Sequence, residues 1–506
     1  MIHNMNHLFV DTFILFFYQF IFSNGVIPNN FNNTYIVPII KDKTKPSEDL
    51  SNLRPISISN TLAQIFERII KIKTPELGLT HRNQFGYKNK TSCTHALFAF
   101  KETIVKHLEE KKHIFAVQLD AVKAFDRVWR DGLFYKLKNK LVNINTVILM
   151  RIYYDKLQAK VKIKNVLSKC FKLTRGVKQG GVLSGDLFNI FIDDLINDCV
   201  NSGLGAKFIL IILCILCFCD DICLLSSSSD DLRLLLKICE QYALKWAIDF
   251  NISKCNFIVF GSCKYNNSIF LLNNSQLNFT EKFKYLGLIF TPFLNMSSFF
   301  IDKFQSVKNS FFSLNSFGFR SNGVNPFLQT FVYKSFCISR ILYGFEIMTI
   351  NKNTLKHLNV AQNDLIRYMT GLSRNSHISN TLKILKLFNI FDLYIYMKLI
   401  FVKNLKTNFI CKSIFTSLLT ANYKKSSLSF IKEFKSICIT LNNHESYIIE
   451  NISDVIAKFK ADNFYYEETT DNELIKICLH NNLDPIMREQ LNFVTYAGPL
   501  ILSKDD

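Results

Sequence analysis

The amino-acid sequence predicts an α+β fold that is divided into two to four compact parts. Short apolar segments typical of buried strands, chiefly residues 114–119 and 208–225, alternate with segments whose apolar residues recur at helical spacing. From residue 297 onward the pattern is mainly helical. With 506 residues, of which 48% are hydrophobic and 20% charged, the chain has a globular composition and enough length for several cores.

The charge balance and the cysteines limit the surroundings of the protein. A formal net charge of +20 favours a polyanionic partner, either nucleic acid or an acidic membrane. The 14 cysteines form no regular framework, which favours reduced thiols inside the cell and argues against secretion. Cys214, Cys217, Cys219 and Cys223 are spaced like metal ligands, but they lie in an apolar segment without a second ligand pair. Buried thiols are therefore favoured over a zinc site.

Residues 8–22 form an apolar stretch that raises the question of a membrane segment. The stretch is shorter than the roughly 20 residues that a span needs, and Asp11 and Gln19 interrupt it. It lacks a basic flank and a cleavage site of the secretory kind. We expect a packed helix and no stable membrane insertion, with a membrane-surface protein as the alternative reading.

Two cations follow or interrupt extended segments in the first part of the chain. Lys41 ends the strand-like residues 35–40, and Arg54 lies in the next extended segment. Such cations can point toward a phosphate, although a solvated surface charge would look the same. Residues 83–87 then form a turn, and a helix is expected over residues 96–108.

Residues 114–119 form a short apolar strand that ends at Asp120. A carboxylate at this position can bind a cation at the edge of a sheet, or it can cap the helix that follows. The segment after that helix is strongly basic, because residues 151–180 contain nine Lys and Arg and one acidic residue. Lys160, Lys162 and Lys164 would share one face of a strand, about 7 Å apart, which suits a phosphate backbone as well as a solvated face.

A glycine-rich loop and an acidic hairpin complete the pattern. Residues 175–186 contain four glycines, which let the main chain approach a ligand, and Gln179 adds an amide. Residues 208–219 are continuously apolar and lead into Asp220 and Asp221. The pair is expected at the turn of a β-hairpin, where an ordinary polar turn is the simpler explanation.

Asp120, Asp220 and Asp221 together point to chemistry. If folding brings the three carboxylates together, their repulsion would require divalent cations. Mg²⁺ fits, because it binds a few carboxylates together with substrate phosphates. Two such ions can activate a 3′-hydroxyl and stabilise leaving pyrophosphate, which is nucleotidyl transfer.

Seven segments, in this order, resemble motifs of the reverse transcriptases of non-LTR (LINE-like) retrotransposons. They are Arg54-Pro55-Ile56-Ser57, Asn83-Gln84-Phe85-Gly86, residues 120–126, residues 176–189, Phe218-Cys219-Asp220-Asp221, Phe250-Asn251 with Lys254, and Tyr285-Leu286-Gly287. The resemblance covers about residues 24–372. It implies a right-hand fold with fingers, a palm built on an antiparallel sheet, and a helical thumb. The expected parts are an N-terminal apolar helix (1–23), fingers (24–115), palm (116–290, with a basic insertion at 151–175), thumb (291–400) and a helical C-terminal extension (401–506).

The resemblance also implies an RNA-directed DNA polymerase that extends a DNA primer on an RNA template with deoxynucleoside triphosphates. It would use two Mg²⁺ ions, with Mn²⁺ as the substitute, and would act in the nucleus and cytoplasm. The residues that match functional positions of the family are Asp120, Asp220 and Asp221 (catalytic metal ligands), Lys254 (protonation of pyrophosphate), Lys41 and Arg54 (triphosphate), Phe125 (a gate against a 2′-hydroxyl), Gln179 and Gly180 (support of the template and nascent pair), and Tyr285, Leu286 and Gly287 (primer grip).

The sequence departs from the family at several positions. Gly185 replaces a usual proline, which would loosen the helix start by about 1 kcal/mol, and Asp186 replaces an apolar residue. Cys219 replaces alanine, and Phe31 replaces a frequent tryptophan. The endonuclease and the Cys/His knuckle of such elements are not evident, so a fragment or truncated copy is expected. An inactive copy that only binds nucleic acid and an intron-encoded, maturase-type reverse transcriptase are the alternatives.

Overall fold

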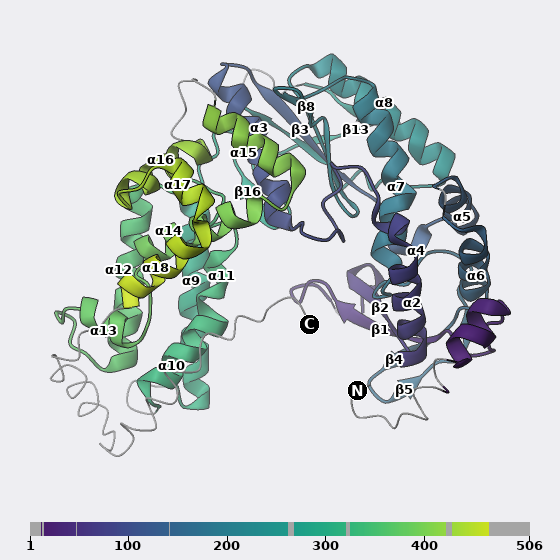
Figure 1. The fold of residues 1–506 in the computed structure, drawn as a ribbon, viewed down its shortest axis with the longest axis horizontal. Coiled ribbons are helices and arrows are strands. Elements are labelled where there is room, and N and C mark those ends of the chain that lie inside the picture. The colour runs from purple at the N-terminus through teal and green to yellow at the C-terminus, as the bar shows by residue number, and fades with distance from the viewer. Residues whose placement is uncertain are drawn as a thin grey trace. The chain divides into compact units, whose positions relative to one another are not determined.

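The computed structural model describes residues 12, 15–46, 48–140, 142–261, 268–319, 324–420 and 428–464. The chain divides into two compact units. The first contains Met1–Gly287 and Thr407–Ile414, and the second contains Leu288–Lys406 and Phe415–Asp506. Strands and helices alternate in the first unit and helices make up most of the second, so the predicted α+β class is confirmed (Figure 1).

A five-stranded sheet in the order β14-β11-β3-β10-β9 forms the centre of the first unit. Its strands are β3 (Ile114–Asp120), β9 (Ile215–Phe218), β10 (Asp221–Ser226), β11 (Asn256–Phe260) and β14 (Asn278–Phe279). The neighbours of β3 and of β10 run antiparallel to them, while β14 is parallel to β11. These strands form because their residues are apolar on both faces, which helices cover.

Helices cover this sheet on both faces. The helices of this part are α3 (Cys93–Glu109), α4 (Ala124–Arg127), α5 (Arg130–Asn139), α6 (Ile144–Asp155), α7 (Ser184–Asn201) and α8 (Ser229–Trp246). Phe115, Val117 and Leu119, alternate residues of β3, join the core that contains α7 and α8. On the other face, Phe100 of α3 packs against Phe260 of β11 with ring centroids 6.0 Å apart.

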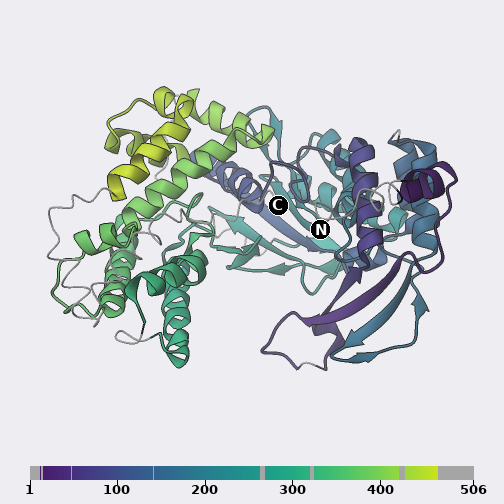
Figure 2. The same cartoon turned by 60° about the horizontal axis from the view of Figure 1, so that its bottom comes forward.

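A second sheet, in the order β2-β1-β4-β5 with β6 beside β4, is formed by strands that precede and follow β3 in the chain. Its strands are β1 (Asn33–Ile40), β2 (Leu53–Ser59), β4 (Gln158–Ile163), β5 (Val166–Leu167) and β6 (Phe171–Lys172). In Figure 2 the purple strands β1 and β2 lie beside the blue strand β4. The predicted basic strand is therefore present, although it ends at Ile163, and Lys164 lies in a left-handed turn (φ 53°).

Helix α2 (Thr61–Lys73) follows β2 and begins where the Asn60 side chain accepts a hydrogen bond from the Ala63 N–H at 2.7 Å. The N-terminal apolar stretch contains a π-helix over Phe16–Ser23, with Phe17 and Ile21 buried in the core. Residues 1–11, 13 and 14 of the predicted helix lie outside the described part. No described helix is long and apolar enough to cross a membrane.

The apolar run before the acidic pair is not one strand. Residues Lys207–Phe208 (β7) and Ile211–Ile212 (β8) form a small hairpin, with Ile209 in a left-handed conformation and Leu210 92% exposed. Only Ile215–Phe218 then enters the central sheet. The four cysteines of this region are free and buried, as predicted.

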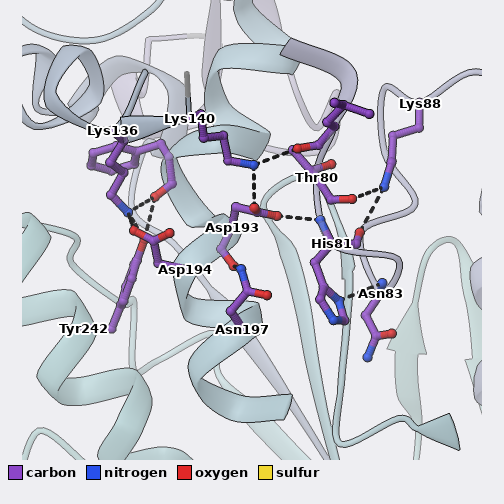
Figure 3. Close-up of polar contacts among 12 residues, drawn as sticks. Thr80, His81, Asn83, Lys88, Lys136, Lys140, Asp193, Asp194, Asn197 and Tyr242 are labelled. Carbon is purple, nitrogen blue, oxygen red and sulfur yellow. Dashed lines mark hydrogen bonds and ion pairs between the residues drawn. The ribbon is translucent and has the colours of Figure 1, made fainter. Parts of the chain in front are cut away.

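A polar network joins α5 and α7 to the loop before residue 88 (Figure 3). The Lys140 Nζ lies 2.6 Å from the Asp193 Oδ2, and the other oxygen of Asp193 accepts the His81 N–H at 2.6 Å. Lys136 is buried and pairs with Asp194 at 2.9 Å. The Asp193 bond fixes His81 beside α7, and backbone bonds of Asn83 and Phe85 with Cys217 join the loop to β9.

The remaining strands of the described chain are short pairs near the boundary of the units. They are β12 (Leu271–Leu272), β13 (Ser275–Gln276), β15 (Phe283–Tyr285) and β16 (Leu288–Phe290). The segment Thr407–Ile414 also belongs to the first unit, where the Arg82 guanidinium lies 3.9 Å from the ring centroid of Phe409.

Apart from β16, the second unit is mainly helical in its described residues, as the sequence predicts. Its helices are α9 (Ser297–Ser313), α10 (Pro326–Val332), α11 (Ser339–Leu342), α12 (Lys352–Thr370), α13 (Ser379–Ile384), α14 (Ile390–Leu405), the end of α15 (Phe409–Thr420), α16 (Phe430–Thr440), α17 (Glu445–Glu450) and α18 (Ile452–Phe464).

Candidate active site

The three aspartates meet at one end of the central sheet. Asp120 is the last residue of β3, and Asp221, the first residue of β10, lies directly opposite it in the antiparallel register. Directly opposed residues have Cα atoms about 4.5–5.5 Å apart. Asp220 occupies the turn between β9 and β10, after Cys219 in a left-handed conformation (φ 56°). Folding therefore joins the acid near position 120 to the acidic pair a hundred residues later.

The electrostatics of this end show unbalanced negative charge. Partial burial raises the pKa of Asp220, and the neighbouring Asp120 raises it further. Burial, followed by the charges of Asp220 and Asp120, raises the pKa of Asp221 to about 6, while Arg54 opposes the shift. Asp221 still has an exposed surface. A cation that binds between these groups would relieve their repulsion.

The donor set suits a hard divalent ion that also binds substrate. Among the described residues, no three or more Asp, Glu, His or Cys side chains form a group, or protein cage, that could hold a metal ion. Mg²⁺ does not need such a cage, because it commonly takes one or two carboxylates together with water and phosphate oxygens. Oxygen ligands at the open end of a sheet fit this behaviour.

The carboxylates have three cations near them, Lys254, Arg54 and Lys41, and Lys123 lies near Lys41. The Lys254 Nζ lies 3.6 Å from the Asp120 Oδ2, and both side chains are partly exposed. Burial lowers the pKa of Lys41, and the charges of Lys254, Arg54 and Lys123 lower it further. Lys41, Arg54 and Lys254 were predicted from the sequence, whereas Lys123 was missed. Its position in a left-handed turn (φ 49°) just after Asp120 depends on the backbone path.

The glycine-rich loop lies against β2. The Ser57 N–H donates to the Gln179 backbone oxygen at 2.7 Å. Gly180 has a φ of 115°, and a Cβ there would be 2.8 Å from the Ser57 oxygen. The Gln179 Oε1 is buried and accepts no hydrogen bond from the described residues. A buried acceptor without a partner costs free energy, so this oxygen is under-satisfied in the structure.

Phe125 lies in α4 beside this loop. The Val177 N–H donates to the Phe125 oxygen at 2.8 Å. The Phe125 ring stacks on Phe188 with centroids 5.1 Å apart and lies edge-on to Tyr87 at 6.4 Å. The ring is thus held from two sides, which is what a steric gate requires.

The structure accommodates two of the departures from the family. A Cβ at position 185 would lie 2.2 Å from the Cγ of Tyr87, so glycine is needed where Tyr87 packs on the start of α7. Asp186 is buried, and its Oδ2 lies 2.6 Å from the Lys71 Nζ. The unusual residues therefore have matching neighbours.

The residues that the sequence predicts as the primer grip are a buried tyrosine and the turn that follows it. Tyr285 is fully buried and packs on Phe100 with centroids 5.0 Å apart, so its side chain supports the turn from inside. Leu286 and Gly287 follow in left-handed conformations, with φ of 42° and 85°.

Sequence reasoning missed Gln84 as a residue of the site. Its Oε1 accepts the Cys219 N–H at 2.8 Å and the Gly86 N–H at 2.9 Å, so Gln84 holds the turn that presents Asp220. Gly86 lies so close that a Cβ would be 2.5 Å from the Cys219 nitrogen. The signal was the segment 83–86 itself, which the sequence indicates as a turn and as one of the seven segments that resemble family motifs.

Comparison with known proteins agrees with this geometry. The family described as reverse transcriptase (RNA-dependent DNA polymerase) matches residues 40–290. The RNA-directed DNA polymerase from mobile element jockey of Drosophila funebris is 26% identical over 370 residues, which cover 71% of this chain and 40% of that protein. The probable RNA-directed DNA polymerase from transposon X-element of Drosophila melanogaster is 25% identical over 372 residues, which cover 70% and 40%.

The chain thus spans about 40% of the length of these relatives. Among solved structures, apo telomerase from Candida tropicalis aligns with a TM-score of 0.42 and 12% identity over 94% of this chain and 74% of that chain. Residues 40–290 therefore belong to the reverse transcriptase family, in the branch of the non-LTR mobile elements.

Proposed function

We propose that this chain is an RNA-directed DNA polymerase that extends a DNA primer on an RNA template. The observation that carries the proposal is the pairing of Asp120 with Asp221 beside Asp220, in a site surrounded by cations. Asp120, Asp220 and Asp221 would hold two Mg²⁺ ions, or Mn²⁺ in their place. Such ions supply an activated 3′-hydroxyl and charge stabilisation at the leaving pyrophosphate.

The cations and the loop have distinct roles in this proposal. Lys41 and Arg54 bind the triphosphate of the incoming nucleotide, since both lie within electrostatic reach of the carboxylates. Lys254, beside Asp120, donates a proton to the departing pyrophosphate. Phe125 excludes a 2′-hydroxyl, and Gln179 with Gly180 supports the nascent base pair.

The partners are an RNA template, a DNA primer and deoxynucleoside triphosphates. Lys160 lies opposite Tyr35 in the sheet register and shares its face with Lys162, which gives a basic surface with an aromatic ring. The Leu286–Gly287 turn serves as the primer grip. We further propose that the protein acts in the nucleus and cytoplasm, which the 14 cysteines without a regular framework and the nucleic-acid partners support.

The parts of a right-hand polymerase are assigned by sequence position. Residues 24–115 are the fingers, 116–290 the palm with its 151–175 insertion, 291–400 the thumb and 401–506 the extension. The boundary between the two compact units, at Gly287–Leu288, supports the division between palm and thumb.

An inactive copy that only binds nucleic acid is not favoured. That reading depended in part on Gly185 and Asp186, and both residues have neighbours that fit them, Tyr87 and Lys71. The names of the similar proteins concern mobile elements and give no support to an intron-encoded enzyme.

Primer extension on an RNA template with Mg²⁺ and deoxynucleotides tests the proposal. Asp220→Asn should reduce extension by about a hundred-fold or more, because a metal contact is worth several kcal/mol. Asp131→Asn is the matched control, since Asp131 is an exposed aspartate on α5 that pairs with Arg151.

Full activity of Asp220→Asn would refute the assigned role. Salt-sensitive RNA binding without extension by the unaltered protein would instead support the binding-only alternative.

A further inference from the structure

A single buried carboxylate joins both ends of the glycine-rich loop. Glu67 of α2 forms an ion pair through its Oε1 with the Nζ of Lys178, the residue before Gln179. The Oε2 of Glu67 accepts the N–H of Leu183, at the other end of the loop, at 3.3 Å. The four residues between these contacts, 179–182, are thus held by the two oxygens of one side chain.

The ion pair is fully enclosed and its polar groups are paired. The side chains of Lys178 and Glu67 are 0% and 1% exposed. The Lys178 Nζ also lies within hydrogen-bonding distance of the Tyr153 OH (2.7 Å), the Ser59 Oγ (2.9 Å) and the Asn32 Oδ1 (3.0 Å). Buried charges are tolerated when they are paired and hydrogen-bonded in this way, and breaking one partner is then strongly disruptive.

The geometry of the loop depends on this contact. A Cβ at Gly181 would lie 3.2 Å from the Glu67 Oε2 and 2.6 Å from the Ser184 Oγ, so the main chain passes directly over the carboxylate. On its other side the loop is tied to β2 by the bond from the Ser57 N–H to the Gln179 oxygen. Residue 179 is therefore clamped between α2 and β2.

We propose that Glu67 and Lys178 are positioning residues for polymerisation, which set the loop that receives the nascent base pair. The inference rests on the proposed function, because it concerns how Gln179 and Gly180 meet the template and the incoming nucleotide. Neither Glu67 nor Lys178 touches substrate. Their loss should act on KM and on base selection, while the metal-binding end of the sheet keeps its geometry.

The first test is Lys178→Met, which removes the charge and keeps most of the side-chain volume. The KM for the correct deoxynucleotide should rise about ten- to a hundred-fold, with more misincorporation, because small displacements of positioning groups have effects of this size. The kcat should fall much less. Hydrogen exchange at residues 179–182 should become faster.

Lys136→Met is the matched control. Lys136 is also a buried lysine of the first unit, paired with Asp194 (Figure 3). Within the described residues its hydrogen bonds go to the Phe191 oxygen and the Tyr242 hydroxyl, and not to the glycine-rich loop. This variant should lose stability without a change in KM. If both variants change KM equally, or neither does, the proposal is wrong.

The double variant Glu67→Gln with Lys178→Met covers the case in which the single variant does not fold. Replacing both members of a buried ion pair with neutral groups is often harmless to stability. The melting temperature should therefore recover while KM stays high, because the ionic link to the loop is still missing. Recovery of KM together with stability would show a purely structural network and overturn the proposal.

The exchange measurement separates this inference from the proposed function. If the unaltered protein does not extend primers, the polymerase proposal fails. Faster hydrogen exchange at residues 179–182 in Lys178→Met, but not in Lys136→Met, would still show that Glu67 and Lys178 hold the loop. Unchanged exchange in Lys178→Met would reject it.

Discussion

Replacing Glu346 in the second unit with glutamine should change how stability depends on pH. Glu346 is 9% exposed, and its Oε2 has no hydrogen-bond partner within the described residues. Burial raises its pKa from 4.5 to about 7, although backbone N–H groups and Lys398 oppose the shift. The folded unit keeps this proton up to about pH 7, whereas the unfolded chain loses it near pH 4.5. The free energy of unfolding should therefore fall as pH rises through this window, by up to about 3 kcal/mol.

Glu346→Gln keeps the shape of the side chain and removes the charge, so it should remove this loss. At pH 8 the variant should be the more stable protein, while near pH 4.5 the two should be nearly equal. Trp129 and Trp246 both lie in the first unit, so fluorescence does not report on the region. Hydrogen exchange in α14, corrected for the intrinsic effect of pH, is the suitable assay. Glu450→Gln, at an exposed position on α17, is the control. An equal difference between variant and unaltered protein at pH 5 and pH 8 would refute the reasoning.

Three further variants test the region around the site. Gln84→Ala leaves the buried Cys219 N–H of the hairpin turn unpaired, which costs about 1–3 kcal/mol of stability. Primer extension should therefore fall, and the Mg²⁺ concentration that gives the half-maximal rate should rise. An unchanged Mg²⁺ dependence would count against this role of Gln84. Gly185→Ala should lower the melting temperature, because the clash of its Cβ with Tyr87 costs about 1–3 kcal/mol, more than the gain of about 1 kcal/mol in helix propensity. Adding Tyr87→Ala should restore the melting temperature. A Gly185→Ala variant that is more stable than the unaltered protein would contradict the close contact. Replacing both Lys160 and Lys162 with glutamine should reduce the slope of log affinity for single-stranded RNA against log salt by about 1.4, and an unchanged slope would remove these lysines from the RNA surface.

The sequence predicts the secondary structure correctly where a short run of residues determines it. Residues 114–119 were recognised as a strand from their continuous apolarity, and the structure has β3 over Ile114–Asp120. The helical spacing that predicts a helix over residues 96–108 was also sufficient, since the structure has α3 over Cys93–Glu109. A continuous run of apolar residues indicates that a segment is buried, but it does not show where the chain turns. The sequence therefore gives no sign that residues 207–212 form a separate small hairpin.

The contacts that shape the site could not be read from local pattern. Glu67 meets Leu183 across 116 residues, and Gln84 meets Cys219 across 135. In the sequence each is one polar residue in an ordinary helix or turn. Only the tertiary fold shows that Glu67 is fully buried and that Gln84 faces the acidic hairpin.

The pairing of β3 with β10 and β11 has a consequence for synthesis on the ribosome. β3 leaves the ribosome about a hundred residues before its partner β10, and β11 follows later still. Until then this apolar strand has two open edges, which makes a nascent chain of this length vulnerable to aggregation. Asp120 and Asp221 cannot pair before β10 has emerged, so the open edges of β3 would favour chaperone binding during translation.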